Sequence, residues 1–446
     1  MKIKKICCIG AGYVGGPTMA VIALKCPEIK VTLVDKDETK IERWNGPLND
    51  LPVYEPGLKE IVKEVRGKNL FFSTNISENI DAAEMIFIAV NTPTKTHGDG
   101  AGFAADLRYV ESSANDIAKY SKSKKIVVEK STLPVRTAEK IKDILNKNES
   151  VSFEVLSNPE FLAEGSAIND LFKSDRVLIG GDQTKSGKEA VQSLFDIYKR
   201  WIPKKKILRV NVWSSELSKL ASNAMLAQRI SSINSLSALC EKTDADIDEV
   251  STAIGLDVRI GPKFLKVSPG FGGSCFKKDI LNLVYLCRFY GLNEVADYWH
   301  GVVKINDFQR TRISSIIEEF CHKNNLDRKV IILGWSFKKD TNDTRESSSI
   351  YVSKNLLEKD YELHIYDPKV KLDKLKNDLS NVGLSKATIE SKIKFYQSLS
   401  SILKEGIPIL IMTEWDEFLE LNNIELDLKI FDFRNILNKD KVIYRF

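Results

Sequence analysis

The sequence predicts an α/β protein with two Rossmann-like, doubly wound domains joined by a long central helical segment. Three observations predict it. Short apolar runs alternate with helical patterns at the start of the chain, the same alternation returns in its last third, and a stretch of helical spacing separates them. Alternating strands and helices are typical of a parallel sheet covered by helices. We place the parts at residues 1–212, 213–325 and 326–446.

The first alternating region contains four strand-like runs, at residues 6–9, 31–34, 85–90 and 126–129. The first run ends in a glycine-rich segment that leads into an apolar helix at about residues 17–24. The middle part has small and apolar residues at helical spacing from residue 215 to about 256. We expect another helix at residues 275–290 and further helix to about residue 322.

The second alternating region opens like the first. Residues 329–333 form a predicted strand that ends in Gly334, a helix follows at residues 347–357, and a strand at 362–366 ends in Asp367. Two more strands are expected at residues 407–412 and 429–433. No tandem repeat or low-complexity tract interrupts the pattern.

Composition excludes several classes of protein. Hydrophobic residues make up 43% of the 446 positions, but no run approaches the roughly 20 apolar residues of a membrane span. The run before the first glycines is too short for a signal peptide, so we expect a cytoplasmic location and no membrane. The seven cysteines and four histidines are scattered, without CxxC spacing, which predicts neither a disulfide framework nor a metal site. A net charge of +5 without a long basic stripe argues against nucleic-acid binding.

A dinucleotide-binding pattern lies at the first strand–helix junction. The segment GAGYVG comprises Gly10, Ala11, Gly12, Tyr13, Val14 and Gly15. Its glycines allow a tight turn and let a pyrophosphate approach the helix N-terminus. Asp35 follows the next strand, where a carboxylate accepts hydrogen bonds from ribose hydroxyls and repels a 2′-phosphate, which favours NAD⁺ over NADP⁺. A glycine turn without a ligand is the alternative; FAD shares the fingerprint, but nothing else indicates a flavin.

The segment SPGFGGSCFKKD, residues 268–279, indicates a reactive cysteine. Its proline and glycines force a loop that can lie close to a ligand. Ser274 is the expected N-cap of the next helix, which places Cys275 at the first helical position, where the helix favours a thiolate. Asp279 lies one turn further on the same face. Most cysteines are small buried residues, and we expect this of Cys7, Cys8, Cys240 and Cys287.

Two further groups of polar residues are weaker signals. Lys219 and Asn223 lie one turn apart on a helix face that continues with apolar residues and therefore turns inward. Such a lysine has a buried partner or polarises an oxygen, although a lysine at a domain edge fits the spacing equally well. Glu160 and Glu164, in NPEFLAEG, occupy a loop where carboxylates are usually solvated.

With these motifs in hand, the chain resembles the animal-type branch of the UDP-glucose/GDP-mannose dehydrogenase family over essentially its whole length. The resemblance is carried by GAGYVG, NPEFLAEG, SELSKLASNA and GFGGSCFKKD. Further matching segments are VNTPT (90–94), EKSTLPVR (129–136), SFKKDTNDTRESSS (336–349) and IYDPKV (365–370). The resemblance implies an NAD-dependent, four-electron oxidation of UDP-glucose to UDP-glucuronate.

The resemblance also implies roles for individual residues. The catalytic residues it implies are Cys275 as nucleophile, Lys219, Asn223, Asp279, Glu160 and Thr132. NAD would contact Gly10, Gly12, Tyr13, Val14, Gly15, Asp35, Lys40, Val90, Asn91, Thr92, Pro93, Thr94, Ser131, Glu164 and Arg345. The nucleotide sugar would contact Glu160, Phe161, Leu162, Ala163, Glu164, Lys219, Asn223, Lys266, Val267, Ser268, Pro269, Gly270, Phe271, Gly272, Phe337, Lys338 and Arg434, with Arg259 reaching the substrate of a neighbouring subunit.

The implied chemistry passes through a thiohemiacetal and then a thioester on Cys275, which divides a difficult oxidation into easier steps. Residues 1–212 would bind NAD, 213–325 would form a dimer interface and 326–446 would bind the UDP-sugar. The resemblance favours a hexamer built from dimers, with a dimer as the alternative, and feedback inhibition by UDP-xylose. Two positions depart from the family: Phe433 replaces a glycine before Arg434, and Lys40 stands where animal enzymes carry arginine.

Two other functions remain open at this point. A sibling enzyme acting on GDP-mannose or a UDP-N-acetylhexosamine would share the cysteine chemistry, but the match over residues 261–279 favours the UDP-glucose branch. A catalytically silent NAD-binding regulatory protein would be expected to have lost at least one of Cys275, Lys219, Asn223 or Asp279, and all four are present.

Overall fold

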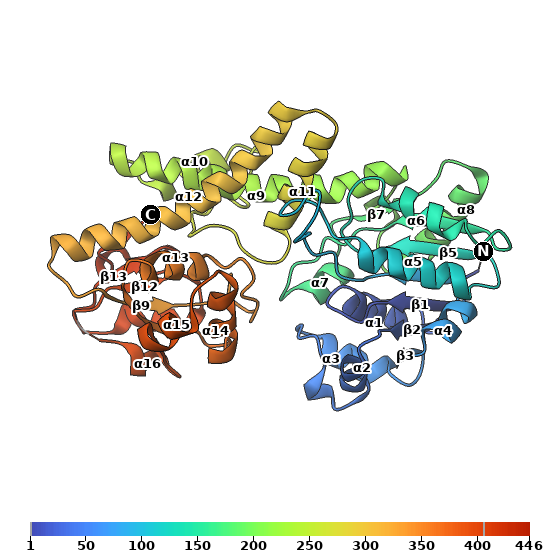
Figure 1. Cartoon of the computed structure of the whole chain (residues 1–446), viewed down its shortest axis with the longest axis horizontal. Coiled ribbons are helices and arrows are strands. Elements are labelled where there is room, and N and C mark those ends of the chain that lie inside the picture. Colours follow the sequence, from blue (N-terminus) through green and yellow to red (C-terminus); the bar gives the residue numbers. More distant parts are fainter. Residues whose placement is uncertain (1, 405) are drawn as a thin grey trace. The chain divides into compact units, whose positions relative to one another are not determined.

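The computed structural model of the chain describes residues 2–404 and 406–446 and divides into two compact units, Met1–Ser222 and Asn223–Phe446 (Figure 1). Each unit contains its own sheet, and the long helix α9 (Val212–Thr243) begins in the first unit and ends in the second. The predicted combination of two Rossmann-like sheets with a long helical segment is confirmed.

The first unit is built on a sheet of eight strands. They are β1 (Lys5–Ile9), β2 (Lys30–Val34), β3 (Leu70–Ser73), β4 (Met85–Ile88), β5 (Lys125–Glu129), β6 (Phe153–Ser157), β7 (Val177–Gly180) and β8 (Ile207–Val210). The order is β3-β2-β1-β4-β5-β6-β7-β8, and only the β6–β7 pair is antiparallel. The order reverses between β1 and β4, the place where doubly wound sheets bind nucleotides at the carboxyl ends of their strands.

Helices cover both faces of this sheet. Alternate residues of β1 face opposite sides: Ile6 and Cys8 join one hydrophobic core, and Cys7 and Ile9 join the other. The first core includes residues of α1 (Gly15–Lys25), α2 (Glu38–Asn45), α3 (Leu58–Val65), α7 (Ala167–Phe172) and α8 (Lys185–Tyr198). The second includes α4 (Ile76–Ala82), α5 (Arg108–Tyr120) and α6 (Thr137–Leu145). Burial on both faces explains why the strands are continuous apolar runs.

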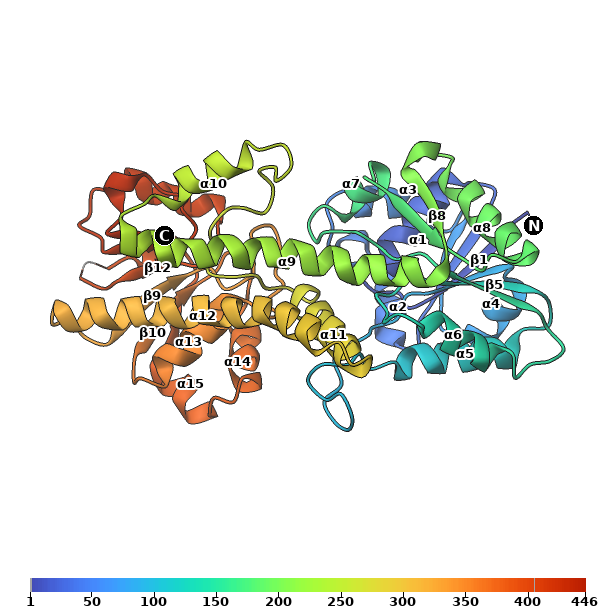
Figure 2. The same cartoon turned by 90° about the horizontal axis from the view of Figure 1, so that it is seen from above.

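The second unit begins with helices. α10 (Ile247–Gly255), α11 (Phe276–Phe289) and α12 (Asn293–Lys323) follow α9, and the second half of α9 packs along α12, where Ser231 donates to the carbonyl of Val302 (Figure 2). The prediction of one helical stretch over residues 215–256 is wrong in one respect, because the structure has two helices there. The backbone turns at Asp244, which has a φ of 53°, and the Asp246 carboxylate caps α10.

The second sheet repeats the order of the first. Its strands are β9 (Lys329–Leu333), β10 (Glu362–Tyr366), β11 (Ile393–Phe395), β12 (Ile409–Ile411), β13 (Ile430–Asp432) and β14 (Tyr444–Arg445). All neighbours are parallel, in the order β11-β10-β9-β12-β13-β14, so the order again reverses beside the first strand. The helices of this region are α13 (Ser348–Leu357), α14 (Leu372–Asn381), α15 (Lys386–Lys392) and α16 (Leu399–Ile402).

The sheet of the second unit depends on a tight turn after its first strand. Gly334 follows β9 with a φ of 97°, and a Cβ there would lie 2.4 Å from Cβ of Thr413. Asp367, at the end of β10, accepts hydrogen bonds from the amides of Trp335 and Ser336. Among the described residues, no helix is long and apolar enough to cross a membrane.

Candidate active site

The glycine-rich segment forms a tight turn between β1 and α1. Gly10 has a φ of 105°, and a Cβ on it would lie 2.4 Å from the carbonyl oxygen of Ala89. A Cβ on Gly15 would lie 2.1 Å from the carbonyl oxygen of Gly10, so neither position accepts a side chain. Gly12 faces open space, which leaves its backbone accessible to a ligand. The Trp44 indole, which sequence reasoning missed, donates to the Ala11 carbonyl at 2.9 Å and supports the turn.

Asp35 lies at the carboxyl end of β2, beside this turn. Its carboxylate accepts hydrogen bonds from the amides of Ala11 (3.0 Å) and Asp37 (3.1 Å) and from Lys40 Nζ (2.9 Å). Partial burial raises the pKa of Asp35, but Lys40 and the two amides outweigh that effect and hold the pKa below its usual value. Asp35 is therefore charged at neutral pH, with Lys40 as its counter-ion.

The other predicted cofactor segments meet at the same edge of the sheet. Ser131 Oγ donates to the Val90 carbonyl at 2.6 Å, and Thr92 Oγ1 donates to the Thr132 carbonyl at 3.0 Å. These bonds tie residues 90–94, which follow β4, to residues 131–136, which follow β5. All of these residues follow strands on either side of the switch point. This geometry suits a dinucleotide, because doubly wound sheets bind nucleotides at that place.

The NPEFLAEG loop is fixed to the glycine turn through two side chains. The amide of Gly165 donates to Glu55 Oε1 at 2.6 Å and to the Tyr13 hydroxyl at 3.2 Å, and the amide of Ala167 donates to Glu55 Oε2 at 3.0 Å. Glu55 is buried and was not singled out from the sequence. Glu160, in contrast to the solvated loop carboxylate that the sequence suggests, is also buried.

Glu160 is the centre of a buried polar group in the first unit. Lys219 Nζ lies 3.1 Å from Glu160 Oε1, the Leu162 amide donates to Oε2 at 2.7 Å, and the Thr132 hydroxyl lies 3.5 Å from Oε1. Burial raises the pKa of Glu160, but Lys219 and the Leu162 amide outweigh it, so the pKa is lowered overall. The side chains of both ions are less than a tenth exposed. Lys219 therefore has a buried partner, which is one of the alternatives that its helix face left open.

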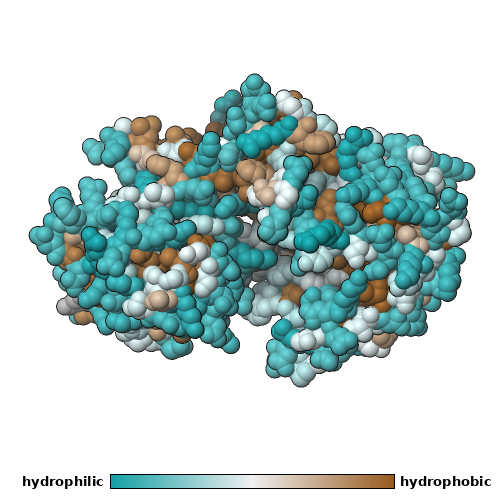
Figure 3. All heavy atoms as spheres, in the orientation of Figure 1, coloured by the Kyte–Doolittle hydropathy of each residue, from teal (hydrophilic) through white to brown (hydrophobic). Residues whose placement is uncertain are grey.

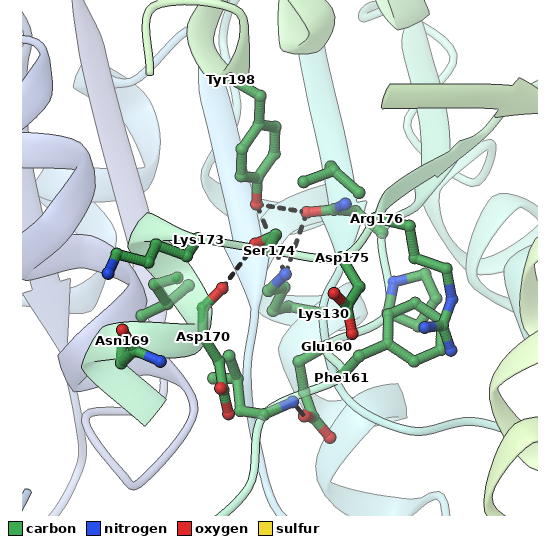
Figure 4. Close-up of a pocket in the computed structure, with 15 residues that line it drawn as sticks. Lys130, Glu160, Phe161, Asn169, Asp170, Lys173, Ser174, Asp175, Arg176 and Tyr198 are labelled. Atoms are coloured by element: carbon green, nitrogen blue, oxygen red, sulfur yellow. Dashed lines mark hydrogen bonds between the residues drawn. The ribbon is translucent and has the colours of Figure 1, made fainter. Parts of the chain in front are cut away.

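Lys130 is a second buried cation near Glu160, and sequence reasoning did not single it out. It lines a cavity of about 290 Å³ with Glu160, Asp170, Arg176 and other residues (Figure 4). Its ammonium donates to Asn158 Oδ1 at 3.2 Å and to the Tyr198 hydroxyl at 3.4 Å. Burial lowers the pKa of Lys130 to about 8, although Glu160 acts in the opposite direction.

In the second unit, Cys275 lies directly before α11. It is the N-cap residue of that helix, so the predicted cap at Ser274 is one residue too early. Its sulfur is half-buried and lies 3.4 Å from the Ser274 hydroxyl. All other cysteines are buried, including the four for which the sequence predicts packing roles.

Asp279, one turn into α11, is fully buried and bound on both oxygens. Asn223 Nδ2 donates to its Oδ2 at 2.6 Å, and Lys278 Nζ lies 2.8 Å from its Oδ1. Asn223 thus connects α9 to the helix that begins at Cys275. Lys219 is one helical turn before Asn223 on α9.

The glycine loop before Cys275 is held by side chains of the central helices. The Phe271 amide and carbonyl bind the Asn306 side chain at 2.8 and 3.1 Å. The Ser268 amide donates to Asn234 Oδ1 at 3.0 Å. Arg310 is 2% exposed and donates to the carbonyls of Phe271 (3.1 Å) and Glu346 (2.7 Å). Sequence reasoning missed these three supports, because single polar residues in apolar helices give no local signal.

Among the predicted sugar-nucleotide residues of the second unit, some are held by the surrounding structure and others are exposed. Phe337 packs on the glycine loop, since a Cβ on Gly272 would lie 2.8 Å from Phe337 Cβ. Arg434 donates to the carbonyls of Met412 (2.8 Å) and Phe337 (2.9 Å), and Phe433 packs in the core, so the departure at this position leaves Arg434 well held. Lys266 is exposed, and Arg259 is exposed and paired with Asp257.

Comparisons with known proteins agree with this arrangement. Models of the UDP-glucose/GDP-mannose dehydrogenase family match its NAD binding domain at residues 4–202, its central domain at 213–308 and its UDP binding domain at 331–439. The UDP-glucose 6-dehydrogenases of Mus musculus and Drosophila melanogaster are 56% and 53% identical to this chain over 98% of its length, covering 90% and 94% of theirs. A UDP-glucose dehydrogenase structure from Pyrobaculum islandicum superposes with a TM-score of 0.86 at 29% identity, covering 99% of this chain and 97% of its own.

The Lys219–Glu160 pair yields a prediction about stability. Lys219→Met leaves a buried carboxylate without its main counter-ion, and we expect it to cost about 3 kcal/mol of folding stability. The double variant with Glu160→Gln should be more stable than Lys219→Met alone, because the unpaired charge is gone. Thermal unfolding of the four proteins of the cycle measures this. Lys140→Met, which breaks the exposed pair with Glu111, is the control and should cost about 1 kcal/mol or less. Additive effects in the cycle would contradict the pairing.

Proposed function

Because this chain belongs to the UDP-glucose/GDP-mannose dehydrogenase family and oxidises UDP-glucose to UDP-glucuronate with NAD, we propose that it does so through a thioester on Cys275. The observation that carries the proposal is the position of Cys275. Among the described residues it is the one cysteine that is not buried, and it is the N-cap residue of α11. The first turn of α11 holds the buried Asp279, which is the hydrogen-bond partner of Asn223 on α9.

The first unit holds the cofactor in this proposal. The glycine turn receives the pyrophosphate, Asp35 binds the adenosine ribose, and residues 90–94, Ser131 and Glu164 line the remainder, with Arg345 as an additional contact. When bound there, NAD⁺ would supply the hydride acceptor for both oxidation steps. The backbone of Gly12 is open for such an approach, and the neighbouring glycines keep the turn tight.

Cys275 begins the covalent chemistry. The C6 alcohol first gives up a hydride, for which bound NAD⁺ would be the acceptor, and a proton to water, which leaves an aldehyde at C6. The thiolate of Cys275 attacks the carbonyl carbon of this aldehyde and forms a carbon–sulfur bond, while the carbonyl electrons move to oxygen as a thiohemiacetal. Lys219 and Asn223, one turn apart on α9, stabilise the negative charge on that oxygen. The low exposure of Lys219 makes its charge effective, because little water screens it. Loss of a hydride from C6 then leaves a thioester on the sulfur.

Hydrolysis of the thioester uses the buried carboxylates. Glu160 accepts a proton from the attacking water, and Thr132 and Asp279 help to position that water. The depressed pKa of Glu160 keeps it ionised and able to act as a base at neutral pH. The carbon–sulfur bond breaks, the thiol is regenerated and the carboxylate product leaves.

The substrate is held by residues from several elements. The residues proposed are 160–164, Lys219, Asn223, 266–272, Phe337, Lys338 and Arg434. Phe337 and Arg434 support each other, because the Arg434 guanidinium binds the Phe337 carbonyl. The buried Asn306 and Arg310 bind Phe271 and so hold the glycine loop that contributes to this set.

We further propose a homo-oligomer, a hexamer built from dimers, in which Arg259 reaches the substrate of a neighbouring subunit. Large apolar side chains are exposed at the end of α11 and on α12, among them Phe289, Val295 and Tyr298, and hydrophobic residues gather over the central helices (Figure 3). Such patches favour association. The same proposal includes a division of the chain into three parts, at residues 212 and 325, and a cytoplasmic location. It also includes competitive inhibition by UDP-xylose, which lacks the C6 carbon.

The thioester route leads to two predictions, one about the NADH formed per sugar and one about the activity of a Cys275 variant. Two NADH should form for each UDP-glucuronate, and Cys275→Ser should nearly abolish turnover while leaving UDP-glucose and NAD⁺ affinity near normal. Cys287→Ala, on the same helix, is the control and should remain active. NADH absorbance with product quantification by chromatography measures both. One NADH per sugar, with free aldehyde accumulating, would refute the covalent route.

The charge of Asp35 leads to a prediction about the preference for NAD⁺ over NADP⁺. Its carboxylate repels a 2′-phosphate, so kcat/KM should favour NAD⁺ over NADP⁺ by about 100-fold or more. Asp35→Asn removes the charge and releases Lys40, which can then bind the 2′-phosphate, and the preference should fall at least about tenfold. Glu38→Gln, a nearby exposed change on α2, should leave the preference unchanged. An unaltered ratio in Asp35→Asn would mean that Asp35 does not contact the ribose.

A further inference from the structure

The first unit also contains two buried carboxyl groups to which the proposed mechanism assigns no role. Glu129 is the last residue of β5 and Glu216 lies in the first turns of α9; they are 1% and 2% exposed. Two ionised carboxylates in such a place would repel each other strongly, because little water separates or screens them.

Glu216 uses its charge to hold the start of α6. Its Oε2 accepts the Arg136 amide at 2.7 Å, and its Oε1 accepts the Ala138 amide at 2.8 Å. Both bonds are charge-assisted, and an anion at a helix N-terminus is favoured by the helix dipole. Burial raises the pKa of Glu216 as well, but the amides of Ala138 and Arg136 oppose this effect, and Glu129 has no such donors in the part of the chain that the structure describes. Glu216 is therefore the ionised member of the pair.

Glu129 has the opposite surroundings. Both of its carboxyl oxygens are sealed from solvent, and neither receives a hydrogen bond from a donor among the described residues. Burial and then the neighbouring Glu216 raise its pKa well above the usual value, and the Ser157 side chain opposes this only in part. An ionised carboxylate without donors would be very costly here, whereas a protonated one has an O–H to donate.

The charged groups nearest the pair do not neutralise it. Arg136 pairs through its guanidinium with Glu139 on α6, at 2.7 Å. Lys130, next to Glu129 in sequence, directs its ammonium to Asn158 and Tyr198 instead. On β6 the facing residue is the uncharged Ser157, and on α9 it is Glu216 itself. Backbone amides thus stabilise the charge on Glu216, and a proton on Glu129 removes the second negative charge of the pair.

We propose that Glu129 is a positioning residue that carries a proton at neutral pH and donates it in a hydrogen bond to Glu216, tying the end of β5 to the starts of α6 and α9. Thr132 follows Glu129 by three residues, and Lys219 follows Glu216 by three residues. The shared proton therefore fixes the two backbone segments that carry these side chains to Glu160. The role in catalysis rests on the function proposed above, whereas the shared proton does not.

The proton has a predictable effect on stability. The folded-state pKa of Glu129 lies above its unfolded value of about 4.3, so between these values the folded chain holds a proton that the unfolded chain has released. Folding stability from this group accordingly falls as the pH rises through that window. The side-chain amide of a Glu129→Gln variant donates a hydrogen bond at every pH, so this variant should lack the pH dependence of folding stability.

The test compares Glu129→Gln with Glu129→Met and the wild-type full-length chain. Thermal unfolding is measured from pH 6 to pH 10. Relative to the wild type, Glu129→Gln should gain stability steadily as the pH rises, while other ionisations cancel in the comparison. Glu139→Gln, an exposed glutamate on α6, is the control and should run parallel to the wild type. A constant difference between Glu129→Gln and the wild type would refute the shared proton, as would a Glu129→Gln chain that fails to fold.

Kinetics separates positioning from a purely structural role. Glu129→Gln should keep at least about half of the wild-type kcat at neutral pH and retain activity to higher pH than the wild type. Glu129→Met has no hydrogen to donate, and its kcat should fall about tenfold or more while its KM for NAD⁺ changes little. If Glu129→Met folds and turns over like the wild type, Glu129 does not position Thr132 and Lys219, even if the stability measurements show the proton. If Cys275 proved not to be the nucleophile, the stability result would be unaffected.

Discussion

The buried ion pair between Lys219 and Glu160 is the interaction on which the organisation of the first unit depends. Removing two charges from water is expensive, and apolar residues of similar size would often stabilise a core as well or better. The pair is therefore best understood through what it positions. Lys219 belongs to α9, and Glu160 belongs to the loop after β6, so the pair joins a long helix to the carboxyl edge of the sheet. Thr132, from the loop after β5, reaches the same carboxylate.

Both units use buried polar side chains to hold loops that would otherwise be mobile. In the second unit, Asn234, Asn306 and Arg310 bind the backbone of the glycine loop, which has few side chains of its own to pack. In the first, Glu55 holds the NPEFLAEG loop and Glu216 holds the start of α6. A glycine loop can approach a ligand closely because it lacks side chains, and for the same reason its shape must be imposed by neighbours. The geometry of the proposed site is therefore maintained by residues to which we assign no substrate contact.

The sequence was sufficient for the fold class and for the main motifs, because both depend on local patterns. The glycine turn, Asp35 and the strands at residues 329–333 and 362–366 all have short-range signatures, and the structure contains them. β3, β6, β7 and β8 were not predicted, since four or five residues bounded by ordinary loops differ little from a buried helical turn. The break at Asp244 was missed because the helical spacing resumes on the other side of it.

The candidate site was harder to predict than the fold, since its groups come together only in three dimensions. Glu160 looked like a solvated loop carboxylate, and Lys219 fitted a domain edge as well as a buried face. Lys130 and Glu129 lie next to each other in the EKSTLPVR segment, yet no local pattern indicates that both are buried. Long-range pairing with Glu160 and Glu216 determines their chemistry, and such pairing leaves no trace in spacing along the chain.

The charges of the two carboxyl clusters in the first unit are best considered together. With a proton on Glu129, the buried groups are two cations, Lys130 and Lys219, and two anions, Glu160 and Glu216, so the set is neutral. Without that proton it would carry a net negative charge in a region of low dielectric. Loss of the Lys130 proton, whose pKa is lowered to about 8, would have the same effect. As the pH falls, Glu216 takes up a proton before Glu160 does, because burial raises the pKa of Glu216 whereas Lys219 holds the pKa of Glu160 below its usual value. Neutrality therefore holds between the protonation of Glu216 and the loss of the Lys130 proton, and in this window Lys219 keeps its carboxylate partner without excess charge around it.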